Sequence, residues 1–162
     1  MRGKVPDMRL LLFCLLLPVL QTSGQILVRL NDAPPVQISA SDLAKLPRHT
    51  AILNNHGQQV SYEGALMRDV LASGGIDFGK ELRGKQLSSY VSALGSDGYQ
   101  VVFALAEFDP TVMDSDIIIA NRREGQPLAA NEGALRIIVP HDKRPTRSLR
   151  LLQEIDVVQL KK

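Results

Sequence analysis

From Ile26 onward, apolar residues come in short runs that turn residues interrupt, and this pattern restricts the chain to a fold built mainly from short strands. Turn-forming residues between consecutive runs, at Asn55-His56-Gly57 and at Gly95-Ser96-Asp97-Gly98, predict two hairpins. The expected strands cover residues 26–30, 36–38, 50–53, 59–62, 87–94, 99–104, 117–120, 135–139 and 155–160.

Two short helices are expected among these strands. Ser41 would cap the first, which runs through Leu43 and Leu46 until Pro47 stops it. The second covers residues 65–72, has its apolar residues on one face, and ends at Gly74-Gly75. The sequence therefore predicts the α+β class, with a mixed β-sheet and short helices.

The first 24 residues have the features of a signal peptide. Arg2, Lys4 and Arg9 precede an apolar run over residues 10–20, and small residues follow it before Gln25. An uncleaved anchor is the alternative, but a membrane-spanning helix needs about 20 apolar residues and this run is shorter. We therefore expect cleavage before Gln25, a periplasmic or secreted protein without a membrane span, and a single domain over residues 25–162.

Charge and cysteine content narrow the function of that domain. Residues 1–24 hold three basic residues and one acid, so their removal takes the formal net charge from +2 to zero. A neutral domain gives nucleic acid no electrostatic attraction, and we expect no nucleic-acid partner. The single cysteine, Cys14, lies in the expected signal peptide, so neither a disulfide nor a thiolate ligand is expected in residues 25–162.

Common catalytic motifs are missing from the sequence, which contains no G-x-S-x-G, H-E-x-x-H, P-loop or G-x-G-x-x-G segment. The three histidines, His49, His56 and His141, are widely separated, and none has a second ligand at helical spacing. No metal site is predicted from these residues.

Four segments carry a family resemblance because they occur in the right order. They are Tyr62-Glu63-Gly64 before the second expected helix, Gly98-Tyr99 at a hairpin, the stretch 119–140, and Arg147-Ser148-Leu149-Arg150. Together they resemble the molybdopterin-binding domain of the sulfite oxidase family, from about Val36 to the end of the chain.

This resemblance implies molybdopterin as a cofactor and assigns roles to several residues. By the resemblance, Arg147, Ser148 and Arg150 form a cradle for the cofactor's phosphate, with Arg136 nearby, and Tyr99 is the active-site tyrosine. Guanidinium groups and a hydroxyl suit a phosphate chemically. Without the family pattern, Arg147 and Arg150 would be interpreted as part of an ordinary solvated face.

Departures from the family pattern leave three hypotheses open. The family's metal-ligating cysteine has no counterpart in Thr50–Asn55, and Glu132 replaces its histidine. We favour an exported binding module that keeps the fold and binds a small anionic ligand or pterin without thiolate-bound molybdenum. The alternatives are a molybdopterin-dependent oxidoreductase with non-cysteine metal ligation, and an accessory partner of an envelope complex.

Overall fold

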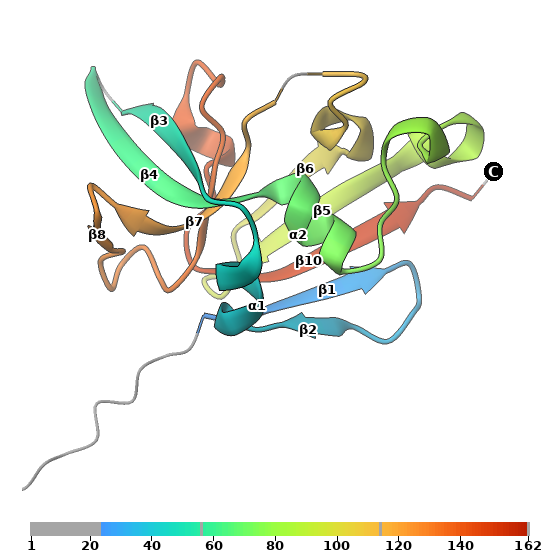
Figure 1. Ribbon diagram of the computed structural model, residues 1–162, viewed down its shortest axis with the longest axis horizontal. Helices are drawn as coiled ribbons and strands as arrows, with labels where there is room; N and C mark the ends of the chain where they lie inside the picture. Colours follow the sequence, from blue (N-terminus) through green and yellow to red (C-terminus); the bar gives the residue numbers. More distant parts are fainter. Residues whose placement is uncertain (1–23, 56, 114, 162) are drawn as a thin grey trace, which may run out of the picture.

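A computed structural model describes residues 24–55, 57–113 and 115–161, and the expected signal peptide up to residue 23 lies outside these residues. Within the described residues, the chain forms two five-stranded sheets with short helices between and around them (Figure 1). This arrangement confirms the predicted α+β class with mixed sheet.

The first sheet has the strand order β2-β1-β10-β5-β6. Its central strands β1 and β10 are parallel, with Leu27 opposite Glu154, and its other pairs are antiparallel. Strands near the two ends of the chain therefore lie side by side, as the blue and red arrows of Figure 1 show. The strands of this sheet are β1 (Ile26–Leu30), β2 (Val36–Ile38), β5 (Ser89–Gly95), β6 (Gln100–Ala104) and β10 (Leu152–Gln159).

The second sheet is antiparallel, with the order β3-β4-β7-β8 and with β9 also paired to β7. Strands β3 and β4 form a hairpin in which Asn55 pairs with Gln58, as the sequence predicted. The strands of this sheet are β3 (His49–Asn55), β4 (Gln58–Leu66), β7 (Ile118–Arg123), β8 (Gln126–Pro127) and β9 (Arg136–Ile138).

Gly64 makes a close contact between β4 and β7 possible. The register of this strand pair shifts between Glu63 and Gly64. A Cβ atom added to Gly64 would lie 2.0 Å from the backbone oxygen of Ile119. Only a residue without a side chain fits at this point in the second sheet.

The helices differ in detail from those expected. The first, α1 (Ala40–Lys45), is capped by Ser39 rather than Ser41, because Ser39 and Asp42 form a reciprocal capping box. The second, α2 (Met67–Ser73), begins later than predicted because Ala65 and Leu66 pair with Ile119 and Ile118 in the sheet. The described residues also form four 3-10 helices: η1 (Gly79–Glu81), η2 (Gly84–Ser88), η3 (Leu105–Phe108) and η4 (Pro145–Arg147).

The core consists of two buried apolar clusters. The larger cluster packs the first sheet against α2 and β9, and includes Phe103, Met67, Leu71 and Ile155, each at most 1% exposed. The smaller cluster covers one face of the second sheet and includes Leu53, Tyr62 and Ile138. None of the helices in the described part of the chain is long and apolar enough to cross a membrane.

Candidate functional site

A buried charged cluster lies where β4, β9 and the loop after η4 meet. Arg136, at the start of β9, stacks its guanidinium 4.9 Å from the centre of the Tyr62 ring on β4. Its Nη1 atom donates to the Tyr62 hydroxyl at 3.0 Å and to the Glu132 carboxylate. Its Nη2 atom donates to the backbone oxygen of Ser148 at 3.3 Å. Arg136 therefore joins the second sheet to the loop that carries the predicted anion-binding residues.

Glu132 is the acidic member of this cluster. Its carboxylate accepts from Arg136 and, at 3.1 Å, from the Tyr62 hydroxyl, and Arg123 Nη1 lies 3.5 Å away. Burial alone would raise the pKa of Glu132, but the hydrogen bond and charge of Arg136 lower it below its usual value. Burial also raises the pKa of Tyr62. Glu132 is therefore ionised at neutral pH and neutralises one of the nearby arginines.

One polar atom of the cluster keeps no partner. The Nε atom of Arg136 is buried and has no hydrogen-bond partner among the described residues. Leaving a buried donor unpaired costs about 1–3 kcal/mol, and such groups in folded proteins call for an explanation. Arg136 also lines a neighbouring cavity.

That cavity has a volume of about 330 Å³ and places three guanidinium groups against one carboxylate. Arg136, Arg123 and Glu132 line it together with Arg150, whose side chain is exposed. Leu53 of β3 forms part of its apolar wall. Three arginines against one acid leave an excess of positive charge, which suits an anion.

A second, smaller cavity of about 230 Å³ lies next to the first and shares Pro145, Ser148 and Arg150 with it. Tyr99 lines this second cavity, and its hydroxyl donates to the backbone oxygen of Thr146 at 2.9 Å. The Ser148 hydroxyl accepts from the Val139 amide at 3.0 Å. Arg150 and Ser148 thus line both of two adjacent cavities.

Arg147 occupies a different environment from the other predicted site residues. Two carboxylates hold its guanidinium: Asp142 binds it through two contacts, at 2.7 and 2.8 Å, and Glu107 through one, at 3.0 Å. It also lies 4.9 Å from the centre of the Phe103 ring. The hydrogen bonds with Asp142 raise the pKa of Arg147 further above its usual value. Arg147 lines neither cavity. Its guanidinium is instead paired with Asp142 and Glu107.

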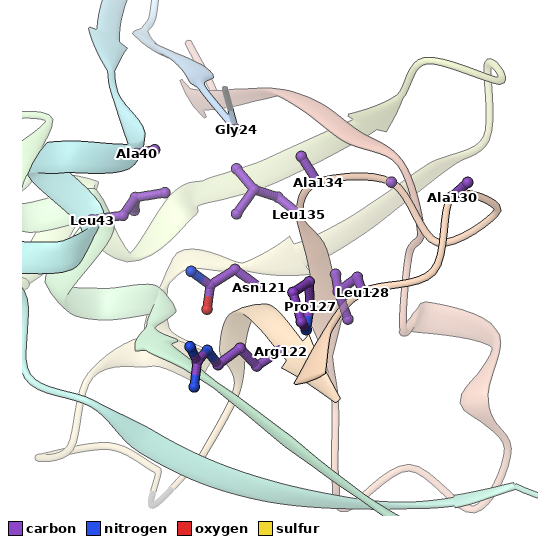
Figure 2. A pocket seen from close by; sticks show the side chains of 11 residues that line it. Gly24, Ala40, Leu43, Asn121, Arg122, Pro127, Leu128, Ala130, Ala134 and Leu135 are labelled. Carbon is purple, nitrogen blue, oxygen red and sulfur yellow. The ribbon is translucent and has the colours of Figure 1, made fainter. Parts of the chain in front are cut away.

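A larger hollow of about 540 Å³ lies elsewhere, between α1, the β7–β8 hairpin and the segment before β9 (Figure 2). Leu43, Leu128 and Leu135 give it apolar walls, and Asn121 and Arg122 project from β7 at one side (Figure 2). None of the residues predicted to form the site lines this hollow.

The structure therefore brings Arg136, Ser148 and Arg150 together, puts Tyr99 beside them, and directs Arg147 elsewhere. The charged cluster is completed by Tyr62, Arg123 and Glu132, for which the sequence predicted no site role. Glu132 and Arg136 lie four positions apart, but that spacing indicates a pair only in a helix, and this segment is a turn and a strand. In the described parts of the chain, no group of three His, Cys, Asp or Glu residues could hold a metal ion.

Comparison with known proteins identifies the family. The family model described as oxidoreductase molybdopterin binding domain matches residues 25–162. The chain belongs to this family, as its motifs indicated. No curated protein matches the chain.

The crystal structure of the sulfane dehydrogenase SoxCD from Paracoccus pantotrophus has a similar fold, with a TM-score of 0.61 and 17% sequence identity. The similarity covers 82% of the present chain but only 37% of the SoxCD chain. At this level of identity the likeness demonstrates the shared fold.

Proposed function

We propose that this chain is an exported binding module that holds a small phosphate-bearing anion in the cavity at Arg150, without thiolate-bound molybdenum chemistry. The observation that carries the proposal is the charge of that cavity. Arg123, Arg136 and Arg150 line it, and Glu132 is the only acid among the described residues that line it. Arg136 also has a buried Nε atom without a hydrogen-bond partner in the described part of the chain. Guanidinium groups in a partly enclosed cavity are well suited to phosphate oxygens.

The cavity fits one part of a molybdopterin cofactor and not another. Its arginines suit the phosphate of a pterin, and the family makes this cofactor plausible. On the β3 side the cavity is lined by Leu53, whose hydrocarbon side chain cannot bind a metal. Residues 25–162 contain no cysteine that could bind a soft metal as thiolate. We therefore assign this chain's residues to anion binding and assign no redox step to them.

The test compares two arginines of one loop. Arg150 lines both cavities, whereas Arg144 is exposed and lines neither of them. Inorganic phosphate at millimolar concentration should raise the melting temperature of the unmodified protein in a saturable way. The Arg150→Ala variant should lose this shift, and the Arg144→Ala variant, which removes the same charge, should keep it.

Chloride at equal ionic strength is the control for general salt effects. An unmodified protein whose melting temperature does not respond to phosphate would contradict the anion site. If both variants lost the phosphate-dependent shift in melting temperature equally, the shift would be a nonspecific effect of charge.

The second candidate, a molybdopterin-dependent oxidoreductase with non-cysteine ligation, is favoured by family membership alone. An inventory of the protein purified from its export compartment separates the two candidates. Fluorescent pterin after acid release, together with about one molybdenum atom per chain, would support the enzyme. A pterin-free protein from a host that makes the cofactor would support the binding module.

A further inference from the structure

Strand β3 forms an open edge of the second sheet. It pairs with β4 on one side and ends the strand order on the other. In Figure 1 the β3–β4 hairpin extends beyond the body of the molecule. A strand at this position can hydrogen-bond with another chain through its free backbone groups.

The bonding pattern of the hairpin identifies which backbone groups are free. Ser61 of β4 lies opposite Ile52. Its backbone amide donates to the Glu124 carboxylate, and its backbone carbonyl accepts from the Glu124 amide. Both backbone groups of Ser61 therefore point to the β7–β8 side of β4. Ile52 and Ser61 therefore form a pair without hydrogen bonds between them, and the backbone groups of Ile52 point to the open edge. By the alternation of an antiparallel strand, Thr50 and Asn54 point the same way. No other backbone segment in the described part of the chain bonds to these three residues.

The β3 edge lacks the features that usually prevent an edge strand from pairing with another chain. Residues 50–55 include no charged side chain and no proline, and the Ile52 side chain is 52% exposed. The open edge of the first sheet, β6, differs because the Glu107 carboxylate accepts from the Ala104 amide. The other outer strands, β2, β8 and β9, have three, two and three residues. The β3 edge is therefore the best suited of these edges to pair with another strand.

We propose that a second copy of this chain pairs with β3 in antiparallel register, across a twofold axis at Ile52. Ile52 would then lie opposite Ile52 of the second copy, and Thr50 opposite Asn54. Each of these pairs points its backbone groups at the other copy, so each exchanges two hydrogen bonds. The strand is uncharged between Thr50 and Asn55, so two copies meet without repulsion. With a twofold axis, the free backbone groups of β3 in both copies form hydrogen bonds in the same contact.

Pairing at this edge and the arginine-lined cavity use different groups of β3: pairing uses backbone groups, and the cavity uses a side chain on one face. Leu53 and Pro145 line that cavity, which places η4 over the Leu53 face of the hairpin. Ile52 points to the opposite face, because successive side chains of a strand alternate. The dimer and the anion site therefore use different surfaces, and failure of one proposal leaves the other standing.

Cysteine cross-linking tests the register. All variants carry Cys14→Ser, so each introduced cysteine is the only thiol in the full chain. Residues 52 of the two copies would have Cα atoms about 5.5 Å apart, within the range of a disulfide. Residues 54 would be separated by four residue steps, about 13 Å, which a disulfide cannot span. Mild oxidation should therefore link Ile52→Cys into a dimer and leave Asn54→Cys monomeric.

Sedimentation equilibrium tests the association without a cross-link. Ile52→Lys places like charges opposite each other and should weaken the dimer at least roughly tenfold. Ile52→Thr keeps a β-branched side chain and should keep the dimer. A monomer at all concentrations up to about 1 mM, the weak end of specific binding, would overturn the proposal. Equal cross-linking at positions 52 and 54 would also overturn it, and so would cross-linking of residue 52 to a different protein.

Discussion

Glu132 is the residue on which the charged cluster depends. Its carboxylate is buried and faces Arg136, Arg123 and the Tyr62 hydroxyl. In Glu132→Gln, the Arg136 charge stays buried without its counter-ion, which should lower the free energy of unfolding by about 3 kcal/mol at pH 7. Urea denaturation measures this loss, and Asp32→Asn, in a solvent-exposed ion pair with Lys161, should leave the urea midpoint unchanged.

The same variant has a defined pH dependence. The pKa of Glu132 is lower in the folded chain than in the unfolded chain, so its stabilisation is complete above its unfolded pKa of about 4.3. The stabilisation is lost as the pH falls through the folded pKa, because Glu132 then becomes protonated. The difference between Glu132→Gln and the unmodified protein should therefore shrink as the pH is lowered below about 4. A difference that stays constant down to pH 3 would contradict this assignment.

At the residue scale, the sequence indicated the loop but not the use of each arginine. The motif 147–150 does border both cavities through Ser148 and Arg150. The partners of Arg147 are Asp142, five positions earlier, and Glu107, which η3 brings from a distant part of the chain. No local pattern indicates that second contact, because it forms only when η3 and η4 come together.

At the element scale, the β4–β7 pair depends on Gly64. A Cβ atom there would lie 2.0 Å from the Ile119 oxygen, a backbone atom that cannot move without breaking the sheet. Gly64→Ala should therefore destabilise the protein by about 3 kcal/mol. Gly57→Ala is the matched control, because Gly57 has a φ of +85° but nothing within 4 Å of an added Cβ. That control should cost only about 1 kcal/mol, from backbone strain.

Comparison of the melting curves of the two glycine variants checks this order. A smaller effect at Gly64 than at Gly57 would show that the sheet can adjust at the register shift between Glu63 and Gly64. The test isolates steric contact from backbone conformation, because both glycines lie in the same hairpin.

Most strands could be predicted because a strand leaves a local pattern. The expected ranges 26–30 and 36–38 match β1 and β2, and both predicted hairpins form. Two of the errors lie where two patterns compete. Ala65 and Leu66 fit the apolar face of a helix, but their pairing with β7 keeps them in β4. The predicted strand from Leu87 begins only at Ser89, because Gly84–Ser88 form η2.

The division of the strands into two sheets could not be predicted from the sequence. The order β2-β1-β10-β5-β6 places the first strand beside the last, and no local pattern encodes that neighbour. It results from burial, since Ile26 and Val28 on β1 and Ile155 and Val157 on β10 are all at most 1% exposed. The side chains of both strands complete the same core.

At the scale of the whole molecule, this parallel pair limits where a chain cleaved after the predicted signal peptide can begin. Gln25 comes one residue before β1, so cleavage there leaves every backbone pair of the first sheet intact. A chain that starts at Gln25 should unfold at the same urea concentration as the full chain. A chain that starts at Asn31 lacks β1, exposes one side of β10 and should fail to fold, as measured by near-ultraviolet circular dichroism and hydrogen exchange.

The mass of the protein recovered from the export compartment completes this test. Export with cleavage before Gln25 predicts a product of residues 25–162, and a mature end beyond Ile26 would contradict the predicted cleavage site. Because Ile26 is fully buried, removing it would leave a gap in the larger apolar cluster next to β10. A stable product that begins after Leu30 would mean that β10 does not need β1, and the first sheet would then tolerate loss of its parallel pair.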